Sequence, residues 1–113
     1  MAETAGVDRA LAYDVFEASA AGAPFVKYKR DAFEHPDTAP VAFRLALVQK
    51  DLELILAFAR RLGVPVAQAE ANLRAVDDAV AQFAERDMSA LAENLRRRRS
   101  ASPQADSDQE RAQ

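Results

Sequence analysis

The chain has 113 residues, half of them hydrophobic, and its 18 acidic and 15 basic side chains give a net charge of −3. This length is typical of one domain with a modest core, and the negative charge argues weakly against general nucleic-acid binding. The absence of cysteine excludes disulfides and Cys-based metal or redox chemistry. Neither a signal peptide nor a segment of membrane-spanning length is apparent, so the expected location is cytoplasmic.

Two helical segments are predicted at the start of the chain. Residues 2–5 look like the last turn of a helix whose beginning is absent, because Gly6 stops it. Asp8 is suited to cap the next helix, which ends in Ala20-Ala21-Gly22. We expect this to be a core helix, with apolar or small residues on two adjoining rows: Leu11, Val15 and Ala18, and Ala12, Phe16 and Ser19.

A mixed aromatic and basic segment follows from Pro24 to Phe33 and fits a short helix or an ordered loop. Its basic groups Lys27, Lys29 and Arg30 either face a cleft or lie on a solvated surface turn, and the surface interpretation is favoured. A turn-rich connection over residues 34–40 comes next, in which Pro40 suits the first turn of the central helix.

The central helix is predicted to begin near Pro40 and to end at Leu62, and from Phe43 onward apolar residues occupy most of the helical circumference. Such a helix is expected in the core, with only the stripe of Gln49, Glu53 and Arg60 meeting water. Gly63 and Pro65 provide a strong stop signal.

Lys50 and Asp51 are the unusual residues of this helix. Lys50 lies at the edge of the polar stripe, whereas Asp51 projects among Leu47, Ile55 and Phe58 on the apolar side. An unpaired carboxylate is costly there, so we expect Asp51 to be buried and paired. Such a break in the local pattern tends to mark a strained or functional position.

Two further helices are predicted after Pro65. The first begins at about Val66, and Asp87 caps the second, which Arg96 to Arg99 close. Residues 100–113 contain no apolar side chain larger than alanine and are expected to be a disordered tail. The prediction is therefore an all-α, single helical domain of about five helices over residues 1–99, around a long central helix. The helix that begins at about Val66 has one apolar row, called its seam, which consists of Ala69, Leu73, Val76, Val80 and Phe83.

Few residues are candidates for chemistry. The only histidine, His35, lies in a loop, and no Gly-rich phosphate loop or metal-ligand spacing occurs, so no catalytic or metal residue is assigned. The run from Arg96 to Arg99 either grips phosphates or complements the helix dipole beside a soluble tail. The structural interpretation is favoured, because no aromatic residues accompany the run and acidic residues follow it.

Several motifs taken together resemble the C-terminal domain of the β-hydroxyacid dehydrogenases, the family of 3-hydroxyisobutyrate dehydrogenase and tartronate semialdehyde reductase. The similarity covers about residues 2–95, and it implies a fold like the C-terminal domain of 6-phosphogluconate dehydrogenase. The motifs are Phe43, Leu47, Gln49-Lys50-Asp51-Leu52, Ala57, Ala59, Gly63-Val64-Pro65 and Asp87-Met88-Ser89-Ala90, with Ala5-Gly6-Val7-Asp8 and residues 15–22 upstream.

The resemblance assigns roles to the unusual pair. In the family, the lysine matching Lys50 reaches toward the nicotinamide end of NAD or NADP, so Lys50 is the expected cofactor-binding residue and Asp51 a structural carboxylate behind it. Family members also carry a Rossmann domain and a Gly-rich catalytic-lysine motif, and neither occurs in these 113 residues. The chain is therefore expected to be inactive alone, as a truncated gene product or as half of a split enzyme.

The expected partners follow from the same resemblance. Because this domain makes the dimer contacts in the family, we expect a homo-oligomer or a Rossmann-domain partner, and neither nucleic acid nor a membrane. A helical dimerisation module without a catalytic role is the alternative. A Rossmann-type segment in the same reading frame would distinguish the two.

Overall fold

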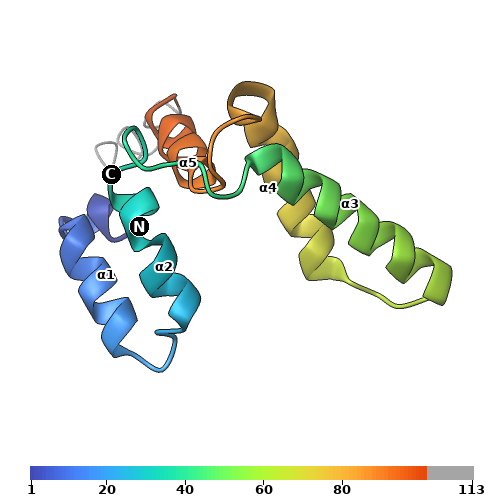
Figure 1. Cartoon of the computed structure of the whole chain (residues 1–113), viewed down its shortest axis with the longest axis horizontal. Helices are drawn as coiled ribbons and strands as arrows, with labels where there is room; N and C mark the ends of the chain where they lie inside the picture. Colours follow the sequence, from blue (N-terminus) through green and yellow to red (C-terminus); the bar gives the residue numbers. More distant parts are fainter. Residues whose placement is uncertain (102–113) are drawn as a thin grey trace, which may run out of the picture.

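The computed structural model describes residues 1–101, in which five α-helices and one 3-10 turn account for nearly all regular structure and no strand is formed (Figure 1). The predicted all-α fold of about five helices is confirmed. The last helix includes Ser100 and Ala101 of the expected tail, and the remainder of that tail, residues 102–113, lies outside the described residues. The elements are η1 (Glu3–Ala5), α1 (Arg9–Ala18), α2 (Pro24–Glu34), α3 (Leu45–Leu62), α4 (Ala67–Phe83) and α5 (Ala90–Ala101).

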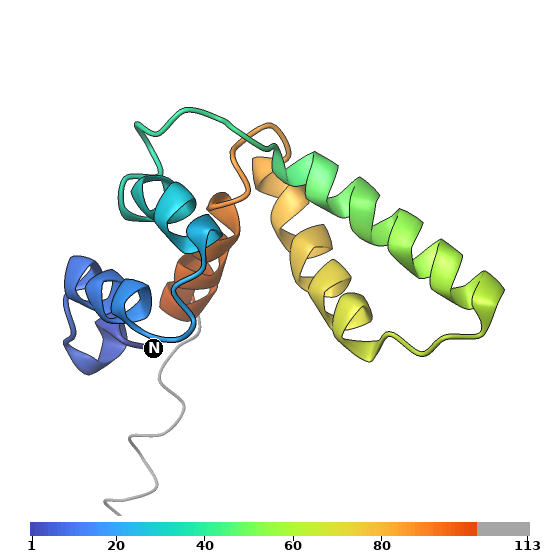
Figure 2. The same cartoon turned by 60° about the horizontal axis from the view of Figure 1, so that its bottom comes forward.

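The helices form two hairpins. α1 and α2 make the shorter one, α3 and α4 make the longer one, and α5 lies between them in both views (Figures 1 and 2). The α3–α4 hairpin projects away from the rest of the molecule, so one side of α3 has no helix against it (Figure 1). No helix within residues 1–101 is long and apolar enough to cross a membrane.

Local signals set most helix ends as predicted. The Asp8 side chain accepts a hydrogen bond from the Leu11 N–H at 3.1 Å and caps α1. Gly63 ends α3 in the left-handed region, with φ 66°, and its N–H donates to the carbonyls of Ala59 and Arg60. Gly63 suits this position because a Cβ is disfavoured in that conformation.

The start of the central helix differs from the prediction, because α3 begins at Leu45 rather than near Pro40. The residues before it run alongside the turn between α4 and α5. Leu45 N–H donates to the Arg86 carbonyl at 2.9 Å, and Met88 N–H donates to the Phe43 carbonyl at 2.8 Å. These long-range hydrogen bonds hold the segment out of the helix.

The buried core is small and lies where the start of α3 meets the end of α4 and the start of α5. Its centre consists of Leu45, Val76, Ala79, Phe83 and Ala90. The predicted seam of α4 is confirmed, since all of its members are at least half-buried and two of them belong to this cluster.

The prediction that only Gln49, Glu53 and Arg60 of α3 meet water is wrong, although Glu53 and Arg60 are exposed as expected. Gln49 is partly buried and donates to Asp77 of α4 at 2.9 Å. α4 covers the side of α3 that carries Leu45, Val48 and Leu52, and the opposite side remains exposed. We call that side the outer face of α3; it consists of Leu47, Asp51, Leu54, Ile55, Phe58 and Leu62, all of them exposed.

The expectation that the helix capped by Asp8 is a core helix is also wrong, and this helix ends at Ala18 rather than in residues 20–22. α1 contains no buried residue, and Leu11, Val15 and Phe16 are each more than half exposed. Its packing is limited mainly to α2, where the Tyr13 and Phe33 rings lie 6.2 Å apart. Because α1 packs against α2 along one side only, its other apolar residues remain at the surface.

Candidate functional site

Lys50 and Asp51 lie on the second turn of α3, next to the outer face. The Lys50 ammonium is 3.5 Å from the Asp51 carboxylate, and the two side chains are 60% and 51% exposed. The expectation of a buried Asp51 is therefore wrong. The helical pattern places Asp51 among apolar residues as predicted, but no other element within residues 1–101 covers them.

The Lys50 side chain is exposed at the surface of α3. Among the described residues its only ion-pair partner is Asp51, at a distance where the interaction is weak. Its ammonium therefore keeps donors for an acceptor such as a phosphate or a carboxamide. The role of Lys50 in cofactor binding stays a prediction from the resemblance.

A second lysine–aspartate pair, Lys29 and Asp87, is buried where α2 meets the turn before α5. The Lys29 Nζ donates to Asp87 Oδ2 at 2.8 Å, and the two residues are only 3% and 6% exposed. The same Oδ2 accepts from the backbone N–H groups of Ala42 and Phe43 at 3.0 and 3.1 Å. One carboxylate thus connects α2, the segment before α3 and the α4–α5 turn.

The environment of Asp87 changes its acidity. Burial alone raises the pKa of this carboxyl, but hydrogen bonds from Lys29 and from the backbone N–H groups of Ser89, Phe43 and Ala42 outweigh burial and hold the pKa well below its usual range. Asp87 is therefore ionised and fully partnered at neutral pH. This pair acts as a structural connection.

Sequence reasoning missed this pair. Asp87 was predicted to cap the last helix, but α5 begins only at Ala90, and Asp87 Oδ1 instead accepts from the Ser89 N–H at 3.1 Å. Lys29 was expected on a surface turn or in a cleft. The spacing of Val26, Lys29 and Phe33 contained the signal, because it places Lys29 on the half-buried row of α2.

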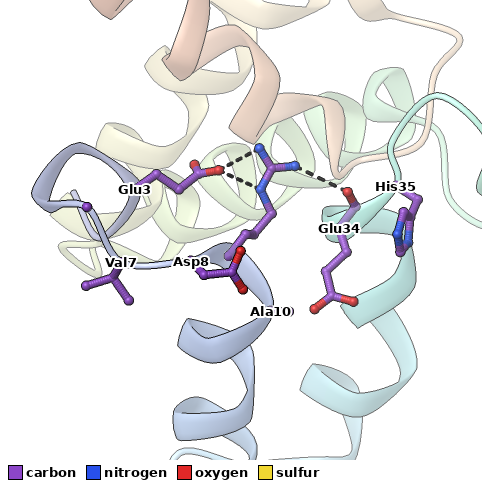
Figure 3. Close-up of a pocket in the computed structure, with 8 residues that line it drawn as sticks. Glu3, Val7, Asp8, Ala10, Glu34 and His35 are labelled. Atoms are coloured by element: carbon purple, nitrogen blue, oxygen red, sulfur yellow. Dashed lines mark hydrogen bonds and ion pairs between the residues drawn. The ribbon is translucent and has the colours of Figure 1, made fainter.

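His35 lines a hollow of about 710 Å³ between the start of α1 and the end of α2 (Figure 3). The Arg9 guanidinium occupies its wall, donating to Glu3 Oε1 at 2.6 Å and to the Glu34 carbonyl at 3.2 Å. His35 is exposed, and its Nδ1 lies 3.1 Å from Asp31. Arg9 is thus paired with Glu3, the Glu34 carboxylate is paired with Arg30, and the Asp8 carboxylate caps α1, so each of these groups has a structural role.

The arginine run on α5 is engaged within the chain. Arg96 bonds to Glu3 and Arg97 to Glu93, both at 3.0 Å. Arg98 bonds to Asp78 at 2.8 Å, and Arg99 donates to the Thr4 hydroxyl. These contacts connect the end of α5 to η1 and α4, a role for the run that the sequence did not predict. Among residues 1–101, no three His, Cys, Asp or Glu side chains are grouped to hold a metal ion.

Comparison with known proteins adds one finding. The family model described as the NAD-binding domain of NADP-dependent 3-hydroxyisobutyrate dehydrogenase matches residues 1–95. No curated protein matches the chain. The match spans most of the chain and includes η1, α1 to α4 and the first half of α5. The chain therefore belongs to the family of the NAD-binding, C-terminal helical domain of NADP-dependent 3-hydroxyisobutyrate dehydrogenase.

Proposed function

We propose that this chain is the NADP-contacting, oligomerising helical domain of a 3-hydroxyisobutyrate dehydrogenase-like oxidoreductase, and that it transfers no hydride by itself. The single observation that carries the proposal is the position of Lys50 in a chain that belongs to this family. Its side chain projects from α3 and is 60% exposed. An exposed cation fits one contact to an anionic dinucleotide. NADP would supply the hydride-transfer chemistry.

The described residues fit a contact to the cofactor but not a complete site for it. A dinucleotide site of the Rossmann type holds the pyrophosphate at a Gly-rich turn. The three glycines of this chain, Gly6, Gly22 and Gly63, are too far apart for such a turn. A single exposed ammonium also binds weakly, and salt screens it. Lys50 is thus proposed to complete a site that a Rossmann domain provides.

Joining this chain to a Rossmann half of a 3-hydroxyisobutyrate dehydrogenase tests the proposal. Loss of one charge-assisted hydrogen bond in Lys50→Ala should raise the dissociation constant of NADPH about ten- to a hundredfold. Lys27→Ala is the matched control, because Lys27 is an exposed lysine on α2, far along the chain from Lys50. Equal affinities of the parent and both variants would reject a cofactor role for Lys50.

A helical dimerisation module without a catalytic role is the second candidate. The observation that favours it is the outer face of α3, whose exposed leucine, isoleucine and phenylalanine side chains need no cofactor to explain them. Under this alternative, Lys50→Ala leaves NADPH binding unchanged in the joined protein, while the isolated chain still self-associates.

A further inference from the structure

Lys29 and Asp87 join the two hairpins of the fold. Lys29 belongs to α2 in the shorter hairpin, whereas Asp87 lies in the turn that follows α4 of the longer hairpin. Both side chains of this ion pair are buried. Such a contact tolerates little movement, because breaking it leaves an uncompensated charge away from water. The pair therefore holds the two hairpins at one angle.

Asp87 also holds the segment that leads into α3. Its Oδ2 accepts from the N–H groups of Ala42 and Phe43, which lie directly before this helix. The Leu45 N–H continues the attachment by donating to the Arg86 carbonyl at 2.9 Å. This N–H belongs to the first turn of α3, where N–H groups have no partner within the helix itself. The start of α3 is thus attached to the segment that contains Asp87.

Lys50 lies close enough to this attachment to depend on it. It follows Leu45 by five positions, which is about 7.5 Å along the helix axis. A tilt of α3 by about 20° at its start would therefore move the backbone of Lys50 by about 2.6 Å. The lengths of good hydrogen bonds vary by only about 0.5 Å. A tilt of this size would remove a contact between Lys50 and a cofactor that is held by another domain.

We propose that the Lys29–Asp87 pair positions Lys50 for its contact with the cofactor. The inference rests on the proposed function and adds two positioning residues to it. Lys29 anchors the pair in the shorter hairpin, and Asp87 anchors it at the start of α3. The α3–α4 hairpin projects away from the other helices, so its direction depends on how its base is held (Figures 1 and 2). Both residues act through Lys50 and do not contact the cofactor.

Titration with NADPH tests this coupling in the full chain joined to a Rossmann half placed before residue 1. There the Rossmann half is attached at the end of the chain that leads into the shorter hairpin. Asp87→Asn should raise the dissociation constant of NADPH at least about fivefold, because an amide has one acceptor oxygen where the carboxylate has two. Lys29→Gln/Asp87→Asn leaves no buried charge unpaired and should have the same effect.

A double-variant cycle separates positioning from a general loss of stability. In Lys50→Ala no ammonium remains to be positioned, so adding Asp87→Asn should raise the dissociation constant by no more than about twofold further. Asp8→Ala is the matched control and should leave the dissociation constant unchanged. It removes a hydrogen bond of an aspartate that acts only within the first turn of α1. Circular dichroism of each variant should show parent-like helicity.

The possible outcomes distinguish this inference from the proposed function. An unchanged dissociation constant in both Asp87 variants would overturn the positioning role and leave the role of Lys50 intact. An equal fold-change with and without Lys50 would do the same, because the effect would then not pass through Lys50. A dissociation constant that is unchanged in Lys50→Ala would reject the proposed function and the positioning role together.

The isolated chain provides a second measurement that needs no cofactor. The chain contains no cysteine, so spin labels can be attached through Ala18→Cys at the end of α1 and Ala67→Cys at the start of α4, both of them exposed positions. After dilution with unlabelled chain, the parent should give a narrow distribution of label-to-label distances. Lys29→Gln/Asp87→Asn should give a wider one. Equal widths would show that the pair does not fix the angle between the hairpins, which would overturn the proposal.

Discussion

Two lysine–aspartate pairs show how environment decides the role of identical side chains. Lys29 and Asp87 are buried, and Asp87 accepts hydrogen bonds from three segments of the chain. Lys50 and Asp51 are adjacent in sequence, exposed and 3.5 Å apart. A buried pair is costly to break, because removal of one partner leaves an uncompensated charge, whereas an exposed pair contributes little. The Lys29–Asp87 pair therefore stabilises the fold, whereas the Lys50–Asp51 pair is available for binding.

The first prediction compares the two aspartates. Asp87→Ala leaves the Lys29 ammonium and the Ala42 and Phe43 N–H groups without their acceptor, so it should lower the free energy of unfolding by about 3 to 5 kcal/mol. Asp51→Ala should change it by less than about 0.5 kcal/mol, because Asp51 is exposed. Urea unfolding measures both. Equal shifts of the two midpoints would contradict the assignment.

The second prediction concerns pH. Because the pKa of Asp87 is lowered in the folded chain, the unfolded chain binds the proton more readily, and stability must decrease as pH falls. The contribution of Asp87 is complete above the unfolded pKa of about 4 and is lost progressively below it. The unfolding midpoint of the parent should therefore decrease from pH 5 to pH 2 more steeply than that of Asp87→Asn. Parallel profiles would show that Asp87 does not titrate with folding.

At the scale of the elements, helix ends were predictable where a single residue sets them. Asp8 caps α1 and Gly63 ends α3, since both signals act within one turn. The start of α3 was not predictable, because residues 43–46 bond to residues 84–88, about forty positions away. Helix periodicity contains no information on such pairing. The α4 seam was predictable because the helix has one apolar row and packs along it.

The third prediction tests the end of α3. Nothing lies within 4 Å of the position that a Cβ on Gly63 would take, so a side chain there meets strain in the backbone and no clash. Gly63→Ala should therefore lower the free energy of unfolding by about 1 kcal/mol, because a Cβ disfavours positive φ. Gly63→Asn is the control and should cost less, since asparagine tolerates this conformation. A larger loss for Asn than for Ala would refute the explanation by strain.

At the scale of the whole molecule, the sequence predicted the fold class and not the burial of each face. The apolar circumference of α3 indicated a central helix, yet only the side toward α4 is covered within residues 1–101. The same limit applies to α1, whose apolar residues remain exposed. Periodicity identifies which residues share a face, but burial depends on which elements exist to cover that face.

We propose that this chain contributes one contact to an NADP site and does not form the site alone. Calorimetric titration of the purified chain with NADPH is the decisive measurement. We expect no saturable heat at micromolar to low millimolar concentration, because an exposed ammonium without a phosphate-binding turn gives only weak, salt-screened attraction. A micromolar binding isotherm for the isolated chain would show instead that the chain forms an NADP site by itself.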